Sequence, residues 1–192
     1  MKRLSFIFTL ISIMFASPVF ADDVTDQIDE ALKAYKKNDY SMATTALDSA
    51  SALIRQKKGD ALAKLLPEPL KGWKAEEAES SSAGAAMFGG GTNVKRVYKK
   101  GKESVTITVT TDSPMLQAMS MMFANPQFSG PNARLVVIDG RKVINDKKKN
   151  SLQTMVAGKI LVNVKGKRKT HPEDVKKYFK AINFKEIEKL NK

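Results

Sequence analysis

The chain has 192 residues, a length that suits one domain or one domain with an appendage. It contains no cysteine, which excludes a disulfide framework, a cysteine nucleophile and a cysteine-based metal site. Hydrophobic residues at 42% and charged residues at 28% are ordinary for a globular protein, whereas the net charge of +13 is unusual.

Residues 1–21 have the order of a secretory signal peptide. Two basic residues at positions 2–3 precede an apolar run over residues 4–15, and Val19-Phe20-Ala21 resembles a cleavage site. The run is shorter than the roughly 20 apolar residues that cross a bilayer. We therefore expect cleavage after Ala21, a mature net charge of +11 and a periplasmic or secreted location in the bacterial envelope. No second long apolar run follows, so we expect no transmembrane span after cleavage.

The excess of positive charge suggests an acidic counterpart. A basic protein often binds nucleic acid, but an exported protein meets little of it. We therefore expect no nucleic acid partner, and an envelope protein or an anionic surface instead.

Residues 22–66 predict a helical hairpin. Apolar residues recur at helical spacing on both sides of a turn at Asn38-Asp39. Gly59 is a typical helix end, so a short further helix is expected after it, from Asp60 to Leu66. The segment from Asn38 to Ala50 resembles the middle of a tetratricopeptide repeat, but the single copy favours a plain hairpin. The two stripes are Val24, Ile28, Ala31 or Leu32, and Tyr35, then Tyr40, Ala43, Leu47, Ala50 and Ile54.

Residues 67–192 predict an α+β domain. Hairpin turns such as Asp139-Gly140 outnumber crossover connections, which indicates a mainly antiparallel sheet with two helices packed on one face. The segment 184–190 fits either a terminal strand or a helical turn. The expected strands are 73–80, 94–100, 103–111, 134–138, 141–145, 151–157 and 160–165, and the expected helices are 113–123 and 172–182.

The sequence shows no catalytic pattern. His171 is the only histidine, and it precedes a proline at a predicted helix start, where local capping accounts for it. Glu76, Glu77 and Glu79 lie in a polar stretch that offers no apolar surroundings for acid–base chemistry. We therefore expect no enzymatic activity and no cofactor.

A glycine-rich loop is the first candidate binding segment. Gly90 stands where a phosphate loop requires lysine, so that motif is excluded. The loop either folds back under the sheet or forms a mobile lip that meets a ligand, a partner or a bilayer. Its candidate residues are Met87, Phe88, Gly89, Gly90 and Gly91.

A methionine-rich helix is the second candidate site. Leu116 and Phe123 share a helical face with three methionines, which favours a core helix in which methionine fills irregular space. The alternative is thioether ligation of Cu(I), since soft sulfur ligands select this ion. The ligands would be Met115, Met119 and Met122.

Four motifs together resemble a group of exported proteobacterial proteins without an assigned function, over about residues 62–190. They are Leu66-Pro67-Glu68-Pro69-Leu70-x-Gly72-Trp73, Gly89-Gly90-Gly91-Thr92, Ser113-Pro114-Met115 and Met121-Met122-x-x-Asn125-Pro126. The resemblance implies a shared fold and no named site.

The expected function is that of a non-enzymatic binding or interaction module. Its counterpart would be a partner protein, a lipid surface or a small ligand. The alternative is a periplasmic metal-handling protein that binds Cu(I) through methionine thioethers.

Overall fold

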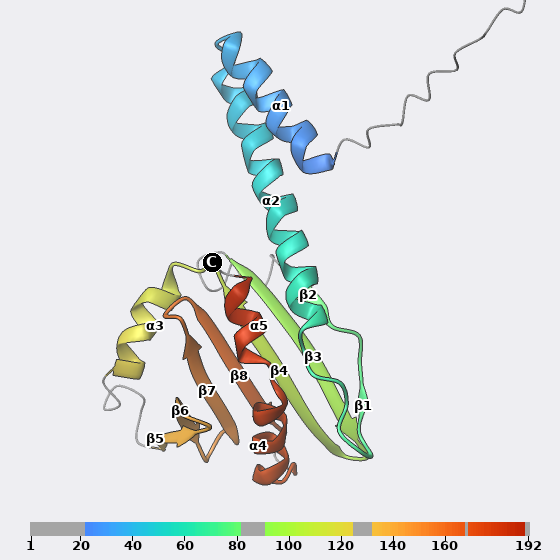
Figure 1. The fold of residues 1–192 in the computed structure, drawn as a ribbon, viewed down its shortest axis with the longest axis vertical. Coiled ribbons are helices and arrows are strands. Elements are labelled where there is room, and N and C mark those ends of the chain that lie inside the picture. The colour runs from blue at the N-terminus through green and yellow to red at the C-terminus, as the bar shows by residue number, and fades with distance from the viewer. Residues whose placement is uncertain (1–21, 82–90, 125–131, 168, 191–192) are drawn as a thin grey trace, which may run out of the picture.

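The computed structural model describes residues 22–81, 91–124, 132–167 and 169–190. Helices α1 (Asp23–Lys36) and α2 (Tyr40–Lys64) pack side by side and form an arm that projects from a single sheet (Figure 1). The predicted signal peptide, residues 1–21, lies outside the described residues, so its cleavage stays a prediction.

Local sequence signals account for the shape of the arm. The Asp22 side chain accepts a hydrogen bond from the Val24 amide at the start of α1, and Asp39 caps α2 by accepting one from the Met42 amide. Asn38 adopts φ 60° in the turn between them. Small side chains fill the contact between the two helices and let their backbones approach closely. They are Ala31, Ala34, Ala43, Ala46 and Ala50, all buried.

The sequence predicted a helix end at Gly59, but α2 continues past this residue. It runs for 25 residues, and Gly59 is buried within it. A Cβ at position 59 would collide with the Ser80 hydroxyl and lie 3.1 Å from a Thr92 methyl carbon. Glycine here therefore allows close contact between the helix and the sheet, and it does not terminate the helix.

The sheet confirms the predicted α+β class with a mainly antiparallel sheet. Its strand order is β1-β3-β4-β8-β7-β6-β5, with β2 also paired to β3, and every pairing among the described residues is antiparallel. The strand predicted over 73–80 is divided into two short strands. The strands are β1 (Lys74–Ala75), β2 (Glu79–Ser81), β3 (Thr92–Lys100), β4 (Glu103–Thr111), β5 (Ala133–Ile138), β6 (Arg141–Asp146), β7 (Ser151–Val156) and β8 (Ile160–Gly166).

One face of the sheet carries the main core. Val105, Ile107 and Val109 of β4 are fully buried there, as their alternation with threonines predicts. Helix α4 (Pro172–Ala181) packs on this face through Val175 and Phe179. The undecided segment near the C-terminus is a helix, α5 (Phe184–Lys189), and its Phe184 and Ile187 join the same core.

The expectation of two helices on one face is not confirmed. Helix α3 (Met115–Ala124) lines a cavity with Thr108, Thr110 and Asn163, which alternate with the core residues and therefore point to the other face. Thr110 is consequently buried, whereas threonines that alternate with core residues usually face solvent. Periodicity identifies which side of a helix is apolar, but it does not specify which side of a sheet the helix covers.

Among the described helices, none is both long and apolar enough to cross a membrane.

Candidate functional site

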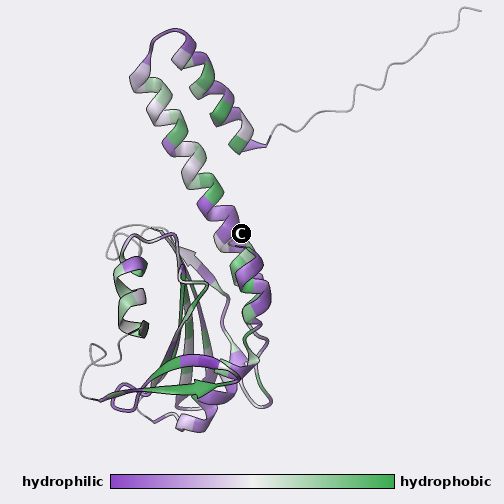
Figure 2. Ribbon diagram, turned by 60° about the vertical axis from the view of Figure 1, so that its left-hand side comes forward, coloured by the Kyte–Doolittle hydropathy of each residue, from purple (hydrophilic) through white to green (hydrophobic). Residues whose placement is uncertain are grey.

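The arm carries an exposed apolar face. Seven large apolar side chains on α1 and α2 are 43–62% exposed, and all but Met42 share one side of the hairpin, while the alanines beside them are buried. Figure 2 shows hydrophobic and hydrophilic segments alternating along both helices, away from the sheet. We call these six residues the arm face: Ile28, Leu32, Tyr35, Tyr40, Leu47 and Ile54.

Helical geometry places the arm face on one side of the hairpin. An α-helix turns by about 100° per residue. On α1 the arm-face residues are therefore rotated to one side of the buried residues Val24 and Ala31. On α2 they are rotated in the same sense from the buried residues Ala43 and Ala50. Because the helices are antiparallel, the two flanks point the same way. The rings of Tyr35 and Tyr40 meet edge to face at 6.0 Å near the tip, which is consistent with a continuous face.

An ion pair defines the register of the hairpin. Lys57 Nζ lies 3.1 Å from Asp22 Oδ1, at the end of the arm nearest the sheet. Two antiparallel helices in that register bring Leu32 level with Leu47. The arm face is therefore centred on these two leucines.

The lower half of α2 is attached to the sheet by a charged contact. Lys58 Nζ donates to both carboxylate oxygens of Asp112, at 2.9 and 2.8 Å, and the Thr111 hydroxyl donates to the same carboxylate at 2.7 Å. Partial burial opposes ionisation, yet the hydrogen bonds from Lys58 and Thr111 prevail and lower the pKa of Asp112. Asp112 therefore holds a charged junction between α2 and the end of β4.

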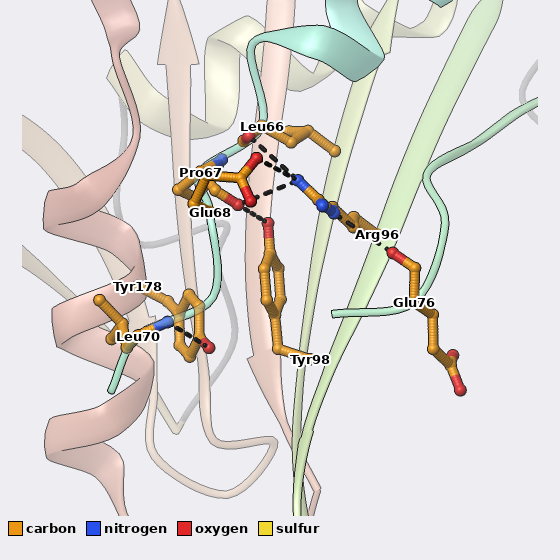
Figure 3. Close-up of polar contacts among 8 residues, drawn as sticks. All are labelled: Leu66, Pro67, Glu68, Leu70, Glu76, Arg96, Tyr98 and Tyr178. Atoms are coloured by element: carbon orange, nitrogen blue, oxygen red, sulfur yellow. Dashed lines mark hydrogen bonds and ion pairs between the residues drawn. The ribbon is translucent and has the colours of Figure 1, made fainter. Parts of the chain in front are cut away.

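A second anchor holds the segment that connects α2 to the first strand (Figure 3). Arg96 on β3 donates to the Leu66, Pro67 and Glu76 carbonyl oxygens at 3.2 to 3.4 Å. The Tyr98 hydroxyl donates to the Pro67 carbonyl at 2.7 Å, and the Leu70 amide donates to the Tyr178 hydroxyl at 3.3 Å.

Burial is the main cause of the raised pKa values of both tyrosines, which therefore remain neutral hydrogen-bonding groups at physiological pH. Trp73 is buried beside them, with its ring 5.2 Å from that of Tyr178. Trp73 thus belongs to the core that supports the arm.

The methionine helix borders a small cavity. Met115 and Met119 line a space of about 80 Å³ together with Asn93 and Asn163, between α3 and the polar face of the sheet. Leu116 and Phe123 are buried, as predicted, but Met115 is 44% exposed and Met121 is 70% exposed. The Met122 side chain lies outside the described part of the structure. Among the α3 side chains that the structure describes, burial thus centres on Leu116 and Phe123, not on Met115, Met119 or Met121.

The glycine-rich loop is described only at its last residue. Gly91 has φ 110°, and a Cβ there would collide with the Thr111 carbonyl and lie 2.9 Å from the Ser113 amide. The loop therefore ends against the segment that joins β4 to α3. Met87, Phe88, Gly89 and Gly90 lie outside the described residues, so their proposed contact role stays a prediction.

Sequence reasoning did not identify two grooves on the part of the chain that the structure describes. A groove of about 370 Å³ runs between α4 and residues of strands β5 to β7, and one of about 540 Å³ lies between α2 and α5. Lysines border both, namely Lys176 and Lys180 on the first and Lys57, Lys64 and Lys189 on the second. No local motif signals either groove, because each arises where segments distant in sequence meet.

The described residues contain no cluster of three or more histidine, cysteine or acidic side chains that could hold a metal ion. His171 caps α4, since its Nδ1 accepts a hydrogen bond from the Glu173 amide at 3.3 Å. Comparison with protein families, with curated proteins and with solved structures gave no match. The candidate function therefore rests on the surfaces of the molecule itself.

Proposed function

We propose that this chain is an exported, non-enzymatic interaction module that docks a protein through the arm face. The single observation that carries the proposal is the exposure of six large apolar side chains on one side of a two-helix arm. Contiguous exposed apolar surface of this kind is typical of interaction sites. The arm does not require these six side chains to hold its two helices together, because alanines already fill the contact between α1 and α2.

A protein suits this surface better than a lipid bilayer does. Amphipathic helices that lie on membranes carry lysine and arginine on the polar face. Helix α1 instead has acidic residues in its first turn, Asp23 and Asp26, and further acidic residues at Asp29 and Glu30. An anionic headgroup layer would repel this end of the arm. A small ligand is also a poor match, since the six side chains form a long exposed strip.

Site-specific photocrosslinking in cells tests the proposal. A photoreactive amino acid replaces Leu47 on the arm face, and a control chain carries it at Ala52, which is exposed on the opposite side of α2. We expect protein adducts at position 47 and few at position 52. Equal yields at the two positions, or none at Leu47, would contradict a docking role, whatever the identity of the partner.

Copper handling is the second candidate function, because Met115 and Met119 line one cavity. They are one helical turn apart, so both thioethers could reach one Cu(I) ion. Competition with a chromophoric Cu(I) chelator tests this, with Met115→Leu and Met119→Leu combined as the variant and Met121→Leu as the control. Copper taken from the chelator by the natural chain and by the control, but not by the double variant, is the expected result. Equal competition by all three proteins would exclude this site.

A further inference from the structure

We infer that the occupant of the arm face is the arm of a second copy of this chain, in an antiparallel two-fold pair. This inference rests on the docking role proposed above and names the partner. Two helices with one apolar side form half of a four-helix bundle, and a second identical layer completes it. A two-fold interface requires a surface that is complementary to itself.

Charge is the first argument for a second copy. Residues 65–192 carry 24 basic and 12 acidic side chains, whereas residues 22–64 carry 7 basic and 8 acidic ones. Two copies of such a basic protein repel each other over most of their surface. The nearly neutral arm is the part through which they can approach.

Charge also determines the direction of the pair. Helix α1 is acidic in its first half, at Asp23, Asp26 and Asp29, and basic near its end, at Lys33 and Lys36. When two arms stack antiparallel on their apolar sides, each α1 lies over the other α1 in the reverse direction. The acidic half of each α1 then lies level with the basic end of the other, and the two basic sheets lie at opposite ends of the bundle. A parallel pair would bring the sheets together.

The spacing of the apolar residues suits the same arrangement. Leu47 lies midway between Tyr40 and Ile54 on α2, seven residues from each. A two-fold axis at the level of Leu32 and Leu47 would therefore put Tyr40 of one copy over Ile54 of the other. The tip of the second arm, at Asn38, would come level with residue 56 of α2. It would stop just before Lys58, where contact with the sheet begins.

The area is sufficient for a specific pair. A large side chain presents about 200 Å² when fully exposed, so six that are about half exposed contribute about 600 Å² of apolar surface per copy. A standard interface buries about 800 Å² on each partner. Polar side chains at the rim of the arm supply the remainder.

Mass measurement tests the pairing on the purified protein. We expect sedimentation to give twice the monomer mass, at low and at high salt, because apolar burial is not screened. The double variant Leu32→Glu with Leu47→Glu should halve the mass. The control Thr45→Glu with Ala52→Glu adds the same charge on the exposed opposite side of α2 and should stay dimeric. Circular dichroism verifies that both variants are folded.

Disulfide trapping tests the direction without disturbing the face by charge. The chain has no cysteine, so an introduced thiol is the only one present. Leu47→Cys lies on the expected axis and should form a covalent dimer on oxidation. Tyr40→Cys and Ile54→Cys should crosslink when the two proteins are mixed, and much less when each is oxidised alone.

A monomeric mass at all concentrations, with no Leu47→Cys dimer, would overturn the inference. If photocrosslinking at Leu47 still yielded adducts of another mass, the docking role would stand and only the identity of the partner would be wrong. Absence of adducts and of dimers would reject both.

Discussion

At the scale of single residues, the arm depends on a few polar contacts that the sequence does not reveal. Asp112 lies 54 positions from Lys58, and Arg96 is 30 and 29 positions from the Leu66 and Pro67 carbonyls that it contacts. Such pairs join separate parts of the sequence after folding. Their positions in the chain are consistent with ordinary surface charges, so only the structure identifies them as anchors of the arm.

The Lys58–Asp112 contact predicts a specific acid sensitivity. Because its partners lower the pKa of Asp112 in the folded state, the stabilisation is present above the ordinary aspartate value, near 4, and is lost as the pH falls through the lower folded pKa. We expect Asp112→Asn to reduce the loss of thermal stability between about pH 5 and pH 2. Thermal melts across this range measure it.

Lys58→Met and the double variant complete a mutant cycle for this contact. The contact is partly exposed, so we expect a coupling of about 1 kcal/mol or less near neutral pH. The coupling should disappear in acid. A coupling that is the same at pH 7 and pH 2 would mean that the ion pair is not its source.

Gly91 is expected to resist substitution more than other glycines in turns do. It combines φ 110° with close backbone neighbours, whereas Gly101 has φ 57° and open space around its Cβ position. Gly91→Ala should therefore cost more than Gly101→Ala, by about 1–3 kcal/mol. Urea unfolding of the two variants gives the comparison. Equal losses would show that neither the φ of 110° nor the close approach to residues 111–113 adds to the ordinary cost of a positive φ.

At the scale of elements, the sequence predicted the order of helices and strands well. The strand predicted over 103–111 is β4, and the helix predicted over 172–182 is α4, which ends one residue earlier. These signals are local and depend on the period of one element. The side of the sheet covered by α3 and the passage of α2 through Gly59 were not predictable, because both depend on contacts between elements.

The candidate site shows the same limit. The apolar stripes of α1 and α2 were visible in the sequence, and a stripe normally indicates a buried face. In the structure the alanines of each stripe form the contact and the large residues remain outside. The pattern therefore contained the arm face, but only the packing distinguishes its buried members from its exposed ones.

Helix α3 offers a direct test of which methionine contributes to stability. Met119 is partly buried beside the cavity, and Met121 is 70% exposed. We expect Met119→Ala to cost at least about 1 kcal/mol and Met121→Ala less than about 0.5 kcal/mol. Thermal unfolding of the single variants provides the measurement. Small and equal effects would indicate that the methionines serve an interface or a metal.

At the scale of the whole molecule, charge is divided unevenly between the arm and the sheet. The excess of basic residues lies in residues 65–192, and the lysines there are dispersed along the chain. Exposed charges act over about 8 Å at physiological salt, so their attraction to anionic surfaces is expected to be weak.

Vesicle binding tests this expectation. Vesicles rich in anionic lipid should retain the protein at low salt and release it at physiological or higher salt. Neutral vesicles serve as the control and should not retain it at any salt concentration. Binding that persists at high salt would require apolar insertion, which would point to the arm face or the glycine-rich loop as a membrane contact.

The continuity of α2 has a mechanical consequence. Bodies joined by glycine-rich segments swing freely, whereas a helix fixes the distance between its ends at 1.5 Å per residue. Leu47 therefore stays about 18 Å along the axis from Gly59, where α2 meets the sheet. In an antiparallel pair with its axis at Leu47, the Gly59 positions of the two copies lie about 36 Å apart along the bundle, and the two sheets are held at that separation. The protein would then serve as a spacer of set length, and the number of residues in one helix would define that length.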